Sequence, residues 1–275
     1  MVQASSLSGR GFFIFFTNSP MSSVPTPSAS GVRDGKVLVV GVGGLGSPAA
    51  LALALAGVGT IGLIDADVVE LSNLQRQILH QTADLGRPKV ASAREKLSRL
   101  NPAAAVIAHH ERLRAENLPR LFHAYDFVID ATDGVATKFL INDGAVLLGT
   151  PFSYGGIVQF TGQTLTVLPR QTACLRCLFP EVPAAEDIPT CQEAGIIGSL
   201  AGSLGLVQAS EAVKYLGGDA ELLTDRLLTY DALAPRWRAV PVKRNPRCPL
   251  CGESPTITTL RNAEQDQGAS CAAGE

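Results

Sequence analysis

Hydrophobic residues in the first half of the chain form short continuous runs that alternate with stretches of helical periodicity. Such runs are typical of buried strands in a parallel sheet, which carry apolar side chains on both faces. We predict strands at 36–40, 60–65, 106–109 and 126–130, and helices at 47–56, 89–100, 115–123 and 135–148. Strands and helices in alternation favour a doubly wound sheet.

The pattern changes after residue 150. Residues 153–168 alternate through glycine-rich turns, which indicates a pair of strands rather than another strand–helix unit. A proline-rich crossover at 180–189 precedes a long helix at 199–216 and two short strands at about 226–230 and 236–242. We therefore expect an α/β fold, with a Rossmann-like, doubly wound, mostly parallel sheet that continues into an antiparallel C-terminal half.

We expect a single domain over residues 34–254. Residues 17–35 are rich in Ser, Pro, Thr and Gly and include a second Met at Met21. Residues 1–33 are therefore predicted to be a disordered leader or a misassigned start, and the polar segment 255–275 a loose tail.

Composition limits the partners to be expected. A chain of 275 residues with 46% hydrophobic residues can bury a substantial core. The formal net charge of −2 provides no basic field, which argues against nucleic acid as a main partner. No apolar run is long enough to span a bilayer. We therefore expect a cytoplasmic protein with no membrane partner.

Four of the six cysteines form two Cys-x-x-Cys pairs, Cys174 with Cys177 and Cys248 with Cys251. Thiolates at this spacing match the ligands of a structural zinc ion. The pairs lie far apart in the sequence, so one ion would join two distant segments of one domain. Disulfides are the alternative, although such pairs in a chain of this size favour metal binding in a reducing cytosol.

A glycine-rich segment directly follows the first predicted strand. Gly41, Gly43, Gly44 and Gly46 lie between this strand and a helix, and Asp65 ends the second strand. In this context backbone N–H groups and a helix N-terminus bind phosphate, and the carboxylate binds ribose hydroxyls. These residues alone would favour NAD. The alternative is that the glycines only allow close packing of helix against strand.

Further polar residues favour a nucleoside triphosphate: Asn73, Arg76, Gln77, Lys89, Asp130 and Asp133. The two aspartates end the fourth strand, where open α/β sheets bind ligands. Cations neutralise phosphate oxygens and a carboxylate holds Mg²⁺. Taken singly, Arg76 and Lys89 could be surface charges and Asp130 a cap. Together they argue for ATP with Mg²⁺.

With these motifs in order, the chain resembles the ThiF/MoeB/HesA family, the bacterial relatives of ubiquitin-activating enzymes. The resemblance extends from about residue 34 to 253 and rests on the glycine loop, Asp65, segments 71–77, 86–89 and 130–133, and both cysteine pairs. It implies an adenylyltransferase that activates the C-terminal glycine of a ubiquitin-like sulfur carrier ending in Gly-Gly and releases pyrophosphate. The product would serve sulfur transfer in thiamine or molybdopterin cofactor biosynthesis.

The resemblance also implies roles for individual residues. ATP would lie over the glycine loop with its ribose on Asp65, its phosphates on Arg76 and Lys89, and Mg²⁺ on Asp133. The other implied nucleotide contacts are Ser72, Asn73, Leu74, Gln75 and Gly134. Cys191 would be the thiol of a sulfur relay, or a loop thiol without a covalent role. A homodimer and a separate sulfur donor are implied as well.

Two features depart from the family pattern. Residues 1–40 contain only Arg10 and Arg33 instead of an arginine-rich segment, and Gly134 stands where the family has Asn. The missing arginine segment leaves a degenerate, non-catalytic family member as one alternative. An NAD(P)-dependent oxidoreductase with an attached zinc site is the other.

Overall fold

The computed structural model describes residues 29–183, 196–218 and 221–262. Their strands form one sheet in the order β3-β2-β1-β4-β5-β6-β7-β8. Neighbouring strands from β3 to β5 are parallel, and those from β5 to β8 are antiparallel. The predicted Rossmann-like sheet with an antiparallel continuation is therefore confirmed.

The parallel part alternates strands and helices, as the hydrophobic pattern predicts. Its elements are α1 (Ala29–Asp34), β1 (Lys36–Val40), α2 (Gly46–Ala56), β2 (Thr60–Ile64), η2 (Leu71–Asn73), η3 (Thr82–Asp84), α3 (Lys89–Leu100), β3 (Ala105–His109), α4 (Leu118–Phe122), β4 (Phe127–Asp130) and α5 (Val135–Leu148).

The second part carries the antiparallel strands and one long helix. Its elements are β5 (Phe152–Val158), β6 (Thr161–Val167), α6 (Leu175–Leu178), α8 (Gly198–Gly217), β7 (Arg226–Asp231) and β8 (Arg236–Pro241). Among the described residues, no helix is long and apolar enough to cross a membrane.

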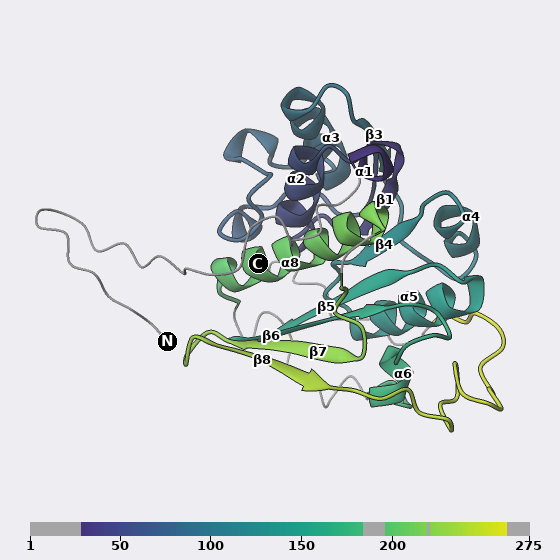
Figure 1. Ribbon diagram of the computed structural model, residues 1–275. Coiled ribbons are helices and arrows are strands. Elements are labelled where there is room, and N and C mark those ends of the chain that lie inside the picture. The colour runs from purple at the N-terminus through teal and green to yellow at the C-terminus, as the bar shows by residue number, and fades with distance from the viewer. Residues whose placement is uncertain (1–28, 184–195, 219–220, 263–275) are drawn as a thin grey trace, which may run out of the picture.

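Helices cover both faces of the parallel part of the sheet (Figure 1). Because successive strand residues point to opposite faces, β1 supplies Val37 and Val39 to one core and Leu38 and Val40 to the other. The first core lies under α2, α3 and α8, and the second under α4 and α5. Two apolar faces explain why the strand sequence is continuously hydrophobic.

Ordered structure extends beyond both predicted domain limits. Helix α1 begins five residues before residue 34, and its Val32 is buried in the first core. At the other end, the N–H groups of Thr256 and Ile257 donate to the Pro249 carbonyl, each at 2.8 Å. Asn262 accepts a 2.7 Å hydrogen bond from Ala115 N–H. The structure therefore describes residues on both sides of the predicted domain, 29–33 and 255–262.

Candidate functional site

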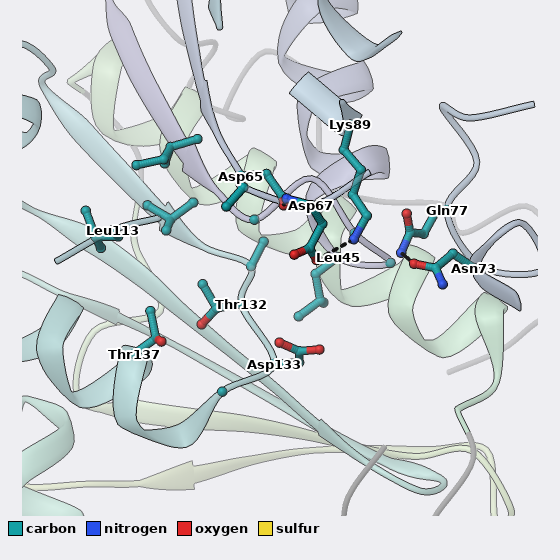
Figure 2. Close-up of a pocket in the computed structure, with 18 of the residues that line it drawn as sticks. Leu45, Asp65, Asp67, Asn73, Gln77, Lys89, Leu113, Thr132, Asp133 and Thr137 are labelled. Atoms are coloured by element: carbon teal, nitrogen blue, oxygen red, sulfur yellow. Dashed lines mark hydrogen bonds and ion pairs between the residues drawn. The ribbon is translucent and has the colours of Figure 1, made fainter. Parts of the chain in front are cut away.

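A cavity of about 600 Å³ opens at the carboxyl ends of β1, β2 and β4 (Figure 2). Strand β1 has β2 on one side and β4 on the other, so the strand order reverses there. Open α/β sheets bind ligands in the crevice at such a switch point. The volume falls within the range of small-molecule sites, roughly 300–1,000 Å³.

The glycine loop forms one wall of this cavity because its backbone approaches other backbone too closely for side chains. Gly41 has a φ of 88°, and a Cβ there would lie 2.8 Å from the Ala131 oxygen. A Cβ on Gly46 would lie 1.8 Å from the Gly41 oxygen. Gly41, Gly43 and Gly44 line the cavity, whereas Gly46 keeps the loop tight from the first residue of α2.

Asp65 follows β2 and holds the glycine loop at the edge of the cavity. Its Oδ2 accepts a hydrogen bond from Val42 N–H at 2.8 Å, and its Oδ1 accepts one from Asp67 N–H at 2.9 Å. Burial raises the pKa of this carboxyl, and nearby Lys89 opposes the shift. Each carboxylate oxygen has a second lone pair, so Asp65 can also accept hydrogen bonds from a ligand's hydroxyls.

Two basic side chains reach the cavity from different elements. Lys89, the first residue of α3, is buried, and its Nζ lies 2.8 Å from Asp67 Oδ2 (Figure 2). Arg76 donates from Nη1 to the Ser72 carbonyl at 3.3 Å. Both side chains line the cavity, so positive charges reach it from segments that are separate in the sequence.

Asn73 and Gln77 form a hydrogen-bonded pair at the same cavity. Gln77 Nε2 donates to Asn73 Oδ1 at 2.6 Å, and Asn73 Nδ2 donates to Ser72 Oγ at 2.9 Å and to Glu70 Oε2 at 3.3 Å. The Glu70 carboxylate only accepts, which fixes the orientation of both amides. Gln77 Oε1 is buried without a partner among the described residues, so a bound ligand or water can donate to it.

Asp130 and Asp133 occupy different environments, although both lie at the carboxyl end of β4. Asp133 is exposed and lines the cavity. Asp130 is fully buried, with Lys138 Nζ 3.3 Å from its Oδ1. Burial raises the pKa of Asp130, and the Lys138 ammonium opposes the shift. Asp130 is thus paired inside the protein, and Asp133 is the carboxylate that can meet a cation.

The structure brings together most, but not all, of the residues that the sequence predicted for the nucleotide. Those lining the cavity are Gly41, Gly43, Gly44, Asp65, Asn73, Arg76, Gln77, Lys89, Asp133 and Gly134. Five others do not line it: Gly46, Ser72, Leu74, Gln75 and Asp130. Ser72 instead supports the Asn73 amide through its hydroxyl. Cys191 lies outside the described residues.

Sequence reasoning missed several residues of the cavity. Lys138, on α5, lines it together with Glu111, Arg112 and Leu113, which follow β3. The segment after β3 had a usable signal, because the carboxyl ends of neighbouring parallel strands share one edge of the sheet. The sequence held no comparable signal for Lys138, because a single lysine in a helix is usually a surface charge.

The four predicted metal ligands converge in one cluster. The Sγ atoms of Cys174, Cys177, Cys248 and Cys251 all lie within 4.8 Å of one another, and none of the four forms a disulfide. Four of the six Sγ–Sγ separations measure 3.4, 3.5, 3.7 and 3.9 Å. Sulfurs on a tetrahedral zinc ion, with bonds of about 2.3 Å, are separated by about 3.8 Å. The donor set therefore fits zinc, and the disulfide alternative is wrong for these residues.

The cysteine cluster is attached to the helix that begins beside Asp133. Leu175 N–H donates to Asn142 Oδ1 at 2.8 Å. The Arg176 guanidinium contacts both oxygens of Asp143, at 3.1 and 2.8 Å. Asn142 and Asp143 belong to α5, so an ion at the cluster would stabilise the helix whose N-terminus borders the cavity.

Comparison with known proteins identifies the family. The model of the ThiF family matches residues 18–250. The chain belongs to the ThiF family. This ThiF-family chain is 45% identical to a sulfur carrier protein adenylyltransferase of Thermus thermophilus, over 85% of this chain and 88% of the relative.

Two further relatives are longer than the matched region. The chain is 43% identical to the adenylyltransferase and sulfurtransferase MOCS3 of Anopheles gambiae, over 85% of the chain and 53% of the relative. It is 42% identical to the probable adenylyltransferase/sulfurtransferase MoeZ of Mycobacterium tuberculosis, over 85% of the chain and 59% of the relative. This ThiF-family chain thus spans just over half the length of these two proteins.

Solved structures show the same fold. The structure of E. coli MccB with ATP superposes with a TM-score of 0.71 at 22% identity, over 81% of this chain and 68% of that one. PaaA superposes with a TM-score of 0.64 at 26% identity, over 79% of this chain and 67% of that one. The ThiF-family fold is therefore supported by sequence and by structure.

Proposed function

We propose that this ThiF-family chain adenylylates the C-terminal glycine carboxylate of a small ubiquitin-like sulfur carrier, with ATP as adenylyl donor. The observation that carries the proposal is the convergence of the glycine loop, Asp65, Arg76, Lys89 and Asp133 on one cavity. The likeness to the Thermus thermophilus sulfur carrier protein adenylyltransferase supports this substrate class. The pathway served would be thiamine or molybdopterin cofactor biosynthesis.

The proposed ATP position follows from the chemistry of the cavity walls. The phosphates lie along the glycine loop, where backbone N–H groups are available, and the ribose hydroxyls donate to Asp65. Arg76 and Lys89 contact phosphate oxygens. Lys89 can exchange Asp67 for phosphate because the Asp67 side chain is 59% exposed and is readily resolvated. Asp133 would hold Mg²⁺, which supplies further positive charge at the phosphates.

The reaction needs alignment and charge neutralisation rather than a general base, because the carrier's carboxylate is already ionised near neutral pH. One carboxylate oxygen attacks the α-phosphorus. The bond from that phosphorus to the bridging oxygen breaks, and pyrophosphate leaves with the electron pair. Arg76 and Lys89 stabilise the negative charge that moves onto the leaving phosphates. The products are an acyl-adenylate and pyrophosphate.

The remaining partners are also part of the proposal. We infer from the family resemblance that a separate protein donates the sulfur. The chain would act in the cytoplasm, where a reducing environment keeps the cluster thiols available for zinc. The family resemblance suggests a homodimer, and Cys191 remains the candidate relay thiol.

ATP–pyrophosphate exchange tests the proposal, with purified protein, Mg²⁺ and candidate carriers ending in Gly-Gly. We expect exchange that depends on the carrier and that Asp133→Ala abolishes. Asp126→Ala is the matched control: Asp126 lies at the other end of β4 and accepts a hydrogen bond from Lys36 N–H. Exchange by Asp133→Ala at the wild-type rate would contradict the metal assignment. ATP binding without exchange for every carrier would favour a degenerate member, and binding of NAD(P) instead would favour an oxidoreductase.

A further inference from the structure

His80 is a buried histidine that joins the glycine loop to helix α3. It is 5% exposed and belongs to none of the motifs described above. Its Nε2 lies 3.1 Å from the Val42 carbonyl oxygen in the loop, and its Nδ1 lies 3.0 Å from Ser92 Oγ in α3. Because both ring nitrogens form hydrogen bonds, His80 links the loop and the helix through polar contacts and does not merely fill space in the core.

The two contacts determine the tautomer of the ring. A carbonyl oxygen only accepts hydrogen bonds, so His80 Nε2 must carry the hydrogen that it donates to Val42. The neutral ring then accepts at Nδ1. Ser92 Oγ accepts a hydrogen bond from Lys96 Nζ at 2.9 Å, and its single hydroxyl hydrogen is shared between His80 Nδ1 and the carboxylate of Asp84, whose pKa it helps to lower.

The surroundings of His80 favour the neutral ring. Burial lowers the pKa of His80, and Lys96 and Lys89 lower it further, against the opposing charge of Asp84 and the hydrogen bond to Val42. The hydrogen on Nε2 is required by the Val42 carbonyl in either charge state, and the lowered pKa favours the neutral ring that carries it. Ser47 Oγ donates to the same Val42 carbonyl at 3.1 Å, so two side chains hold this one oxygen.

Holding the Val42 carbonyl also orients the next N–H group. No cis peptide bond occurs in the described chain, and in a trans peptide the C=O and the following N–H point in opposite directions. The Val42 carbonyl points into the protein toward His80. The N–H of Gly43 therefore points the other way, to the side of the cavity that Gly43 lines. Within the described residues this N–H has no hydrogen-bond partner.

We propose that His80 is a positioning residue for nucleotide phosphate. By fixing the Val42–Gly43 peptide plane, it keeps the Gly43 N–H directed at a phosphate oxygen of the bound nucleotide. Asp65 holds the preceding N–H, that of Val42, at 2.8 Å, so consecutive peptide planes of the loop are each held by a side chain. The inference rests on the proposed use of ATP.

The test is calorimetric titration of the full-length, zinc-loaded protein with ATP, ADP and adenosine. His80→Phe keeps a ring of similar size but removes the donor. We expect it to weaken ATP and ADP binding about tenfold, the equivalent of one buried hydrogen bond of about 1.4 kcal/mol, and to change adenosine binding less than about twofold. His80→Gln retains an N–H donor and should bind ATP within about threefold of the wild type.

His109→Phe is the matched control. His109 is also partly buried and its ring bonds to Tyr125 Oη at 3.1 Å, but it does not line the cavity. Its substitution should leave the affinity for all three ligands unchanged. Should His80→Phe fail to fold, Ser47→Ala removes the other donor to the Val42 oxygen and should show the same selective loss for ATP and ADP.

The outcomes separate the two proposals. An unchanged ATP affinity in His80→Phe, or equal losses for ATP and adenosine, would overturn the role of His80 in phosphate positioning while leaving the proposed function intact. A wild-type protein that binds no ATP would overturn the proposed function, and the role of His80 with it.

Discussion

Replacing Lys138 with methionine tests whether the ion pair beneath the cavity is essential to the fold. The Asp130 side chain is fully buried and that of Lys138 is 7% exposed. Lys138 Nζ lies 3.3 and 3.4 Å from the two Asp130 oxygens and donates to the Thr132 carbonyl at 2.7 Å. It also donates to the Gly155 carbonyl in β5. Without the ammonium, the Asp130 carboxylate keeps, within the described residues, only the backbone N–H and the side-chain hydroxyl of Thr132 as donors.

Two responses limit the cost of the substitution. If the Asp130 carboxylate stays charged, the free energy of unfolding falls by about 3–5 kcal/mol, as is typical when a buried ion pair is broken. If Asp130 takes up a proton instead, the free energy of unfolding falls by about 1.4 kcal/mol for each unit by which the pH exceeds the ordinary aspartate pKa of about 3.9. At pH 7 this amounts to about 4 kcal/mol. The less costly response prevails. We therefore expect Lys138→Met to lower the free energy of unfolding by about 3–4 kcal/mol at pH 7 and by about 2 kcal/mol at pH 5.5.

Urea unfolding followed by circular dichroism measures this loss at both pH values. The double variant Asp130→Asn/Lys138→Met is the control, because it removes both charges and should recover at least half of the stability. A loss below about 1 kcal/mol at pH 7, or one that does not shrink as the pH falls, would refute the reasoning.

Three further predictions follow from single sites. Cys174→Ser should reduce bound zinc, measured by mass spectrometry, and lower the midpoint of unfolding, because metal binding is coupled to folding; unchanged zinc content would contradict the metal assignment. Gly46→Ala should lower the free energy of unfolding by about 1–3 kcal/mol, because the added Cβ would lie 1.8 Å from the Gly41 oxygen. Gly202→Ala is the control, because a Cβ there meets nothing within 4 Å. It should be neutral or stabilising in the same urea assay. The lowered pKa of His80 means that the unfolded chain binds more protons below about pH 6.5, so stability should fall as the pH drops through this range. The difference in unfolding free energy between the wild type and His80→Gln, measured as a function of pH, gives the contribution of His80. Identical pH profiles for the two proteins would argue against that contribution.

The sequence by itself determined the order and type of the elements. Continuous apolar runs identified the strands β1, β2 and β4 because both of their faces are buried. The glycine loop, Asp65 and the two cysteine pairs were also recognisable, since these residue types at these spacings have few other uses. Such signals are local: each depends on neighbours within one or two elements.

Only the tertiary structure decided which side chains share a site. Asp130 and Asp133 are equivalent in the sequence, yet one is paired with Lys138 inside the protein and the other faces the cavity. His80 bonds to Val42, a residue from another element, and Asn262 holds the C-terminal segment to Ala115. These contacts join residues that no periodicity relates. They form because a buried polar group must find its partner wherever the packed elements bring one within hydrogen-bond distance.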